Sequence, residues 1–402
     1  MSSHLTIVSP ERSASALRPA LGGLLAVAVG IGVGRFVYTP ILPPMMAGLG
    51  MSQSVGGGIA SANFAGYLAG ALFAAGPWAP GSRQAWLLGA LGASVLSTAA
   101  MGLLHGLVPF LAMRFVGGAA SALVLILATA LVLERIAEAG RPDLSAVLFA
   151  GVGAGIAASA VLVAVLRWAG MDWQALWLGS GILSLAGAVG AAVLLPRAQP
   201  PRPVRSSAGR AVPGQGLLRM ATAYGLFGFG YVITATFLVA IVRAEPNIRP
   251  LEPVAWVVFG LAAVPSVALW TALARRVGVP RAFAVAAATE ALGVLASVFW
   301  PGAGGVILAG VLVGGTFMGL TALGLMHGRA LAGDDPRRVL ALMTGAFGLG
   351  QIVGPGFAGL LSDRLGSFAV PSLVAAAALL GAAILAAMET EAMETDRREI
   401  AP

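Results

Sequence analysis

The sequence of 402 residues contains no cysteine, no lysine and little charge of either sign. The missing cysteines exclude disulfide bonds, thiolate metal sites and cysteine nucleophiles. Charged residues make up 10% of the chain, whereas apolar residues make up 58%. A soluble protein of this length needs far more charge to cover its surface. The composition therefore argues against a soluble enzyme or binding domain and indicates a chain that lies almost entirely in a lipid bilayer.

Apolar segments long enough to cross about 30 Å of hydrocarbon follow one another along nearly the whole chain. Charges, prolines and glycines separate them into twelve predicted membrane-spanning helices. These are expected near residues 17–46, 54–76, 84–104, 106–133, 144–167 and 172–195, and near 216–242, 253–274, 282–300, 303–328, 338–362 and 367–388. We therefore predict an all-α polytopic membrane protein.

One long polar segment, residues 196–215, separates the two sets of six. The predicted organisation is a tail (1–16), an N-terminal half (17–195), a linker (196–215), a C-terminal half (216–388) and a second tail (389–402). Arginine predicts the orientation, because basic loops stay in the cytosol. With both termini inside, the inner loops hold 18 of the 24 arginines and the outer loops four. We expect a multi-pass protein of the bacterial inner membrane with tails and linker in the cytosol.

Glycine patterns repeat between the two halves at nearly one spacing. The matched positions are Gly32 with Gly228, Gly117 with Gly314, and Gly153 with Gly348, at offsets of 196, 197 and 195 residues. Two parallel six-helix repeats joined by a linker are typical of major facilitator transporters, which bind substrate between the halves near the midplane. The repeat predicts the major facilitator fold, with two six-helix pseudo-repeats. We expect the protein to be a monomer.

Particular segments carry a closer resemblance. Residues 32–43 (GVGRFVYTPILP) and 61–71 (SANFAGYLAGA), together with 351–355 (QIVGP) and 362–364 (SDR), resemble the YbfB/YjiJ family of bacterial major facilitator transporters. The resemblance implies the major facilitator fold and transport by alternating access, without a substrate. Residues 114–120 (RFVGGAA) resemble the fourth-span arginine motif that the superfamily links to proton coupling. The fifth-span Gly-Pro pair of drug antiporters is missing from residues 151–159 (GVGAGIAAS).

Two arginines lie inside predicted spans, where a charge costs at least about 2.5 kcal/mol and needs a partner, a water-filled cavity or a function. Arg35 in the first span is expected to bind an anionic group of the substrate. The alternative for Arg35 is a structural bond to free carbonyl oxygens. For Arg114 in the fourth span, relaying substrate charge or protons and bracing the helices are equally open.

Two further titratable residues lie in or near span interiors. Glu290 is the one acid in the middle of a span, and His327 is placed near the inner end of the tenth span. Both are proton-coupling candidates, and Arg114 is a third. A structural hydrogen bond for Glu290 and a helix-end or inner-gate role for His327 are the alternatives.

Uncharged polar side chains at helical spacing add oriented donors to an otherwise apolar pocket, although each also suits a contact between helices. The predicted substrate-binding residues are Arg35, Tyr38, Asn63, Tyr67, Arg114, Tyr224, Tyr231 and Gln351. Gly354 and Pro355 in the eleventh span form the predicted hinge or gate, because proline removes a backbone hydrogen bond at membrane depth.

The excess of arginine over acid in the spans predicts the substrate. A carboxylate entering between the halves would offset part of the desolvation cost of the arginines. We therefore predict a secondary active transporter for a small organic, anionic solute, linked to protons. The alternative is a proton-driven efflux pump for drugs or metabolites, with both arginines structural.

Several other function classes are not expected. The glycine runs lie in apolar spans with no preceding strand, so they do not form a phosphate-binding loop. The three histidines are not paired at a spacing that suits a metal. We expect no enzyme activity, cofactor, metal site or nucleic-acid partner. The expected partners are a small-molecule substrate, protons and the lipid bilayer.

Overall fold

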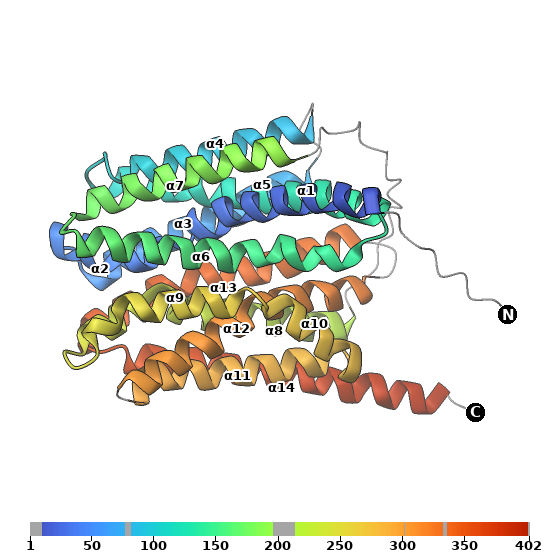
Figure 1. Cartoon of the computed structure of the whole chain (residues 1–402). Helices are drawn as coiled ribbons and strands as arrows, with labels where there is room; N and C mark the ends of the chain where they lie inside the picture. The colour runs from blue at the N-terminus through green and yellow to red at the C-terminus, as the bar shows by residue number, and fades with distance from the viewer. Residues whose placement is uncertain (1–9, 77–81, 196–213, 301, 333–335, 401–402) are drawn as a thin grey trace.

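The computed structural model describes residues 10–76, 82–195, 214–300, 302–332 and 336–400, and every regular element in these ranges is a helix. Two bundles lie side by side, and α1 begins at the same end of the molecule at which α14 finishes (Figure 1). The N-terminal bundle contains α1 (Pro10–Val27), η1 (Ala28–Val33), α2 (Tyr38–Leu49), α3 (Gln53–Ala75), α4 (Arg83–Ala100), α5 (Leu107–Glu138), η2 (Pro142–Leu144), α6 (Ser145–Trp168) and α7 (Trp173–Leu194). The C-terminal bundle contains α8 (Gln215–Ala244), η3 (Arg249–Leu251), α9 (Glu252–Ala263), α10 (Ser266–Val277), α11 (Val279–Phe299), α12 (Ala303–Ala330), α13 (Pro336–Leu365) and α14 (Ala369–Ile400).

Each of the twelve predicted spans coincides with one helix or with two or three consecutive helical elements. In the described residues, nine helical segments are long and apolar enough to cross a membrane, and the bent pair α9 and α10 makes a tenth. The all-helical fold is therefore confirmed, while membrane crossing by α3 and α4 stays a prediction. Residues 196–213 of the predicted linker lie outside the described residues, as do 1–9 and 401–402 of the predicted tails.

The first predicted span is broken where one continuous helix was expected. A π-helix, η1, is followed by a turn at residues 34–37 before α2 begins. Pro40 has no N–H to donate to the carbonyl oxygen of Phe36, and its ring crowds that carbonyl. The N–H of Thr39 takes this place, at 3.2 Å from the Phe36 oxygen. Thr39 therefore does not donate to the carbonyl oxygen of Arg35, and the carbonyl oxygens of Gly34 and Arg35 instead accept from a side chain of another helix.

The eighth predicted span is also broken. Helices α9 and α10 meet at an angle of 45°. Pro265 lies at the junction and has no N–H for the carbonyl oxygen of Leu261, so the helix bends there. Ser266 and Trp270 then donate to the carbonyl oxygen of Gly315 in α12, both at 2.8 Å. The bend is therefore held by bonds to a neighbouring helix.

The predicted repeat corresponds to equivalent helix contacts in the two halves. Gly155 of α6 lies against η1, where a Cβ on Gly32 would be 2.6 Å from the Gly155 Cα. In the other half Gly350 of α13 lies against α8, where its Cβ would be 2.7 Å from the Phe229 backbone nitrogen. Two residues earlier, Gly153 contacts α9 and Gly348 contacts α3, each across the boundary between the halves. The fifth and eleventh spans thus occupy matching positions.

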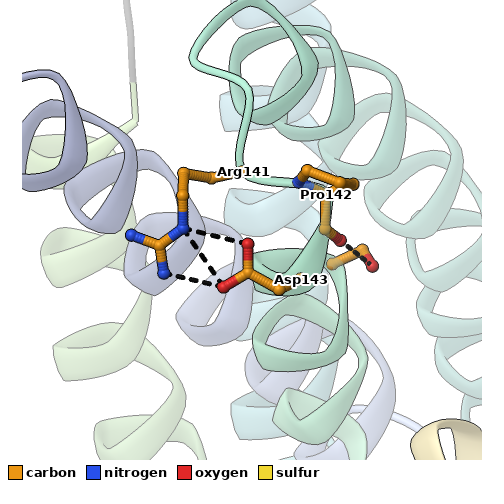
Figure 2. Close-up of polar contacts among 4 residues, drawn as sticks. Arg141, Pro142 and Asp143 are labelled. Carbon is orange, nitrogen blue, oxygen red and sulfur yellow. Dashed lines mark hydrogen bonds and ion pairs between the residues drawn. The ribbon is translucent and has the colours of Figure 1, made fainter. Parts of the chain in front are cut away.

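The short connection between α5 and α6 is a turn at the end of the bundle where α1 begins (Figure 1). Figure 2 shows the guanidinium of Arg141 facing the carboxylate of Asp143, with the shortest N–O distance at 2.7 Å. These hydrogen bonds favour the charged form of Arg141 and raise its pKa. The Ser145 hydroxyl donates to the Pro142 carbonyl oxygen at 2.7 Å and completes the turn.

Candidate functional site

Arg35 lies in the turn between η1 and α2, next to the boundary between the halves. Its side chain is 6% exposed. The guanidinium carbon lies 4.5 Å from the centre of the Phe64 ring and 4.4 Å from that of the Tyr67 ring. Within the described part of the chain, Nε and Nη2 have no hydrogen-bond partner. Aromatic faces stabilise the positive charge of the guanidinium. They do not provide the hydrogen-bond acceptors that Nε and Nη2 need.

Arg114 in α5 is equally buried and has a different environment. Its two terminal nitrogens donate to the carbonyl oxygens of Gly34 and Arg35, each at 2.9 Å. These are the carbonyl groups freed by the break in the first span. The ring of Tyr38 lies 4.9 Å from the guanidinium carbon. Arg114 thus bridges α5 to the broken helix, as in the bracing alternative, and its substrate-binding and proton-coupling roles stay predictions.

The other predicted polar residues of the N-terminal half also differ in their partners: some bond to backbone groups and one lies against Arg35. Asn63 of α3 donates to the Arg114 carbonyl oxygen at 2.9 Å. The Tyr38 hydroxyl donates to the Gly56 carbonyl oxygen at 2.7 Å. Both residues therefore connect helices, whereas Tyr67 lies against Arg35. The structure brings Arg35 and Tyr67 together in one place and gives Tyr38 and Asn63 backbone partners.

The C-terminal half contributes a stack of aromatic rings from α8, α12 and α13. Tyr224 and Phe347 stack at 4.7 Å between ring centres, and Phe227 and Tyr231 at 5.0 Å. Tyr231 also stacks on Phe317 at 5.8 Å. The Tyr224 hydroxyl donates to the carbonyl oxygen of Thr321 at 3.1 Å. The predicted residues Tyr224 and Tyr231 therefore belong to one buried aromatic cluster.

The two halves meet at Arg35 and this cluster. Phe36, the next residue after Arg35, contacts Phe317 at 5.6 Å and Trp256 at 6.5 Å between ring centres. Gln351 of α13 donates through Nε2 to the Tyr231 hydroxyl, and its Oε1 has no partner in the residues described. Tyr231 is within electrostatic range of Arg35. The predicted residues Arg35, Tyr231 and Gln351 thus lie near the boundary between the halves, whereas Tyr38 and Asn63 bond within the N-terminal half.

Glu290 and His327 lie in the C-terminal half. Glu290 of α11 is fully buried, and neither carboxyl oxygen has a hydrogen-bond partner within the described ranges. The nearby Thr316 hydroxyl donates instead to the Leu312 carbonyl oxygen at 2.6 Å. His327 in the last turn of α12 is 3% exposed, and its Nε2 also lacks a partner there. Glu290 is within electrostatic range of Tyr231. Proton coupling by either residue stays a prediction.

Hydrogen bonds also join the halves at the end of the bundle opposite the start of α1. The carboxylate of Asp363, near the end of α13, accepts the backbone N–H groups of Gln53 and Ser54 at 2.9 and 2.8 Å. These groups begin α3, so a negative charge meets the positive end of a helix. The Thr39 hydroxyl donates to the Ala235 carbonyl oxygen at 2.7 Å. These bonds hold the two bundles together at this end.

Comparison with known proteins now identifies the family. Residues 27–387 match the family described as "Uncharacterised MFS-type transporter YbfB". The chain belongs to this family. Within the described residues no group of three or more histidine, aspartate or glutamate side chains lies together in a way that could hold a metal ion. As a member of this family, the chain is a membrane transporter of the major facilitator superfamily.

Solved structures of transporters have the same fold. The crystal structure of a point mutant of the nucleoside transporter NupG has a TM-score of 0.70 and 14% identity, over 93% of this chain and 99% of that one. A bacterial homolog of the human lysosomal transporter Spinster, in an inward-facing and unoccupied conformation, has a TM-score of 0.68 and 14% identity, over 96% of this chain and 98% of that one. At this identity the likeness supports the fold alone. No curated protein is significantly similar in sequence.

The predicted hinge lies in a continuous part of the transporter. Helix α13 passes through Gly354 and Pro355 without a break. A Cβ on Gly57 of α3 would meet the Pro355 carbonyl oxygen, so α3 and α13 are in close contact here. The described breaks are instead at residues 34–37 and at Pro265. Hinge motion at Gly354 and Pro355 therefore stays a prediction.

Sequence reasoning missed the phenylalanines of the site. Phe36 and Phe64 surround Arg35, and Phe227, Phe317 and Phe347 complete the aromatic cluster. In an apolar span a phenylalanine resembles a lipid-facing residue, so composition gives no signal. Spacing does give one, because Phe227 with Tyr231 and Phe347 with Gln351 are four residues apart and share a helix face.

Proposed function

We propose that this transporter carries a small organic anion across the inner membrane by alternating access, and that Arg35 binds its anionic group. The observation that supports this most strongly is the buried guanidinium of Arg35, which lies among aromatic rings with two donors unpartnered in the described residues. A buried cation without acceptors is costly. A carboxylate has two oxygens that fit the fork of a guanidinium and would supply both missing acceptors.

The position of Arg35 links binding to movement. Phe36 contacts rings of the C-terminal half, and Tyr231 and Gln351 are close by on that side. An anion bound to Arg35 would therefore interact with both halves at once. A ligand shifts a conformational equilibrium only if it binds the states differently, and a site shared by two moving bodies meets that condition.

Alternating access requires the contacts at the far end of the bundle to open. The candidates are the bonds from Asp363 to the start of α3 and the bond from Thr39 to Ala235. The Asp363 bonds lie near the start of α3 and the end of α13, where these two helices can separate without exposing long stretches of backbone, and the Thr39 bond joins α2 to α8. The predicted hinge at Gly354 and Pro355 lies in α13.

Proton linkage follows from the energetics of moving an anion. Against a negative-inside potential, bringing one negative charge inward costs about 2.3 kcal/mol per 100 mV. One proton per monovalent anion removes this cost. Glu290 and His327 are the candidates for holding that proton, because each is buried with an unpartnered polar atom in the described residues.

Purified protein in liposomes tests the proposal. A thermal-shift screen with organic acids, amino acids, sugars and cationic drugs selects the ligand class, and we expect stabilisation by carboxylates. At about 100 times its Kd a ligand adds about 2.7 kcal/mol to the free energy of unfolding. We then expect uptake of the selected carboxylate into liposomes with an alkaline interior, insensitive to the membrane potential.

The uncharged amide of the same acid and empty liposomes are the controls. Uptake that accelerates with a positive interior and ignores the pH gradient would contradict the proton link while leaving anion transport intact. Stabilisation by cationic drugs alone would contradict anion transport itself and favour the efflux alternative.

Orientation gives a separate prediction. Reporter fusions after Arg205 and at Pro402 should be active only in the cytosol, and a fusion after Ile248 only in the periplasm, because arginine-rich loops stay inside. Activity assays of paired cytosolic and periplasmic reporters measure this directly. A periplasmic signal after Arg205 would reverse the proposed orientation.

A further inference from the structure

A cavity separate from Arg35 lies between the halves, beside the first half of α2, near the C-terminal ends of α6 and α8 and at the beginning of α9. Its volume is about 310 Å³, within the usual range for sites that hold small molecules. We call it the inter-half vestibule. Its walls include Arg167 and Trp168 of the N-terminal half, and Arg249, Glu252 and Trp256 of the C-terminal half.

The charges around the inter-half vestibule do not cancel. Glu252 forms an ion pair with Arg243 at an N–O distance of 3.5 Å, and both side chains are about one-fifth exposed. Arg243 does not line the cavity, whereas Arg167 and Arg249 do. Since the pair of Arg243 and Glu252 is neutral, the two lining arginines give the cavity a positive potential.

Two other acids lie in the neighbouring loops. Glu245 is exposed just after α8 and does not line the cavity. Asp172 accepts the backbone N–H of Ala175 at 2.8 Å and caps α7. Neither therefore occupies the space between Arg167 and Arg249.

The remaining walls are apolar and aromatic. Trp256 is fully buried, and its Nε1 has no hydrogen-bond acceptor in the residues that the structure describes. Trp168 is 90% exposed at the mouth. Pro40 and Pro44 form the wall on the α2 side. Indole and proline rings accommodate an apolar body, while guanidinium groups accept the charge.

We propose that the inter-half vestibule is a second binding site, which takes the anionic group of a molecule with an apolar body through Arg167 and Arg249. Both a soluble organic carboxylate and the phosphate of a membrane lipid have this chemistry. Because its walls come from both halves, an occupant stabilises their present arrangement. This inference rests on the proposed function in one respect: the proposed orientation of the transporter determines the side of the membrane that the vestibule faces.

Quenching of tryptophan fluorescence by 4-bromobenzoate tests the site in the full chain, embedded in phosphatidylcholine nanodiscs. We expect saturable quenching that weakens on replacing Trp168 by phenylalanine, and none with uncharged 4-bromobenzyl alcohol. The double variant Arg167→Gln/Arg249→Gln should raise the Kd about tenfold or more, because two charge-assisted contacts are lost. Arg364→Gln removes an exposed arginine at the same end of the bundle, outside the cavity, and should leave the Kd unchanged.

Further measurements separate the outcomes. Arg35→Gln should leave this Kd unchanged; a failure of the proposed transport role of Arg35 is therefore distinguishable from a failure of the vestibule. If phosphatidylglycerol in the nanodiscs weakens probe binding to the wild type but not to the double variant, the occupant is the lipid; if it has no effect, the occupant is the soluble anion. The proposal is overturned if quenching does not saturate, if the double variant binds like the wild type, or if Arg35→Gln abolishes binding.

Discussion

Replacing Arg35 by glutamine is expected to lower anion transport by about two orders of magnitude and to leave the protein folded. A hydrogen bond to a charged group contributes about 1.5–3 kcal/mol, and 1.4 kcal/mol is tenfold in binding, so even one lost bond has a large effect. Stability should change little, because Nε and Nη2 of Arg35 bond to no other group in the described residues. Initial transport rates in proteoliposomes, normalised to folded protein, measure the effect.

The lysine variant is the matched comparison for Arg35. Lysine keeps the charge but lacks the planar fork, so Arg35→Lys should retain more transport than Arg35→Gln and still bind a carboxylate more weakly than arginine does. Arg364→Gln, at an exposed position, should transport normally. Unimpaired transport of any substrate by Arg35→Gln, or drug efflux that persists in it, would refute the assignment and favour the efflux alternative.

Hydropathy predicted where the helices lie because burial in lipid demands long apolar segments. Hydropathy, however, is averaged over a segment of many residues, so it does not detect the loss of a single backbone hydrogen bond. It therefore gave one helix for residues 17–46, where the structure has α1, η1, a turn and α2. Pro40 was visible in the sequence, but its effect falls on the carbonyl groups of the preceding turns. The break at Pro265 was missed for the same reason.

The repeat was more informative than any single motif. Glycines at a nearly constant offset predicted that the fifth and eleventh spans correspond, and Gly155 and Gly350 indeed make equivalent contacts with the first and seventh spans. Only a residue without a side chain allows two helices to approach this closely, so such contacts leave a pattern in the sequence. Contacts between the halves that use carboxylates and backbone groups, such as Asp363 with Ser54, leave no comparable pattern.

The two intramembrane arginines could not be distinguished from sequence. Both lie in apolar spans near glycines, and a structural role was open for each. The difference depends on the turn at residues 34–37, because the carbonyl groups freed there are the partners of Arg114. Arg35 belongs to that turn, but its guanidinium lies against the rings of Phe64 and Tyr67, and its Nε and Nη2 have no partner in the described residues. A tertiary contact between the first and fourth spans thus gives both terminal nitrogens of Arg114 a partner, so that only its Nε is unpartnered in the described residues, whereas Nε and Nη2 of Arg35 both are.

Replacing Arg114 by leucine is accordingly expected to destabilise the fold. The carbonyl oxygens of Gly34 and Arg35 would lose both donors in a region that excludes water, where an unsatisfied backbone group is costly. Two bonds from a charged group suggest a loss of about 3–5 kcal/mol in the free energy of unfolding. Titration of the purified protein with a denaturing detergent, followed by circular dichroism, measures this loss.

Arg114→Lys separates the contribution of the charge from that of the two-carbonyl bridge. One ammonium group cannot span both oxygens in the geometry of a guanidinium, so this variant should lie between the wild type and Arg114→Leu in stability. Transport per folded molecule should fall far less in Arg114→Lys than in Arg35→Gln, because the turn that positions Arg35 is still held. If Arg114→Leu instead unfolds like the wild type and selectively loses transport, Arg114 belongs to the binding machinery and the bridge to the broken helix is not what holds that turn in place.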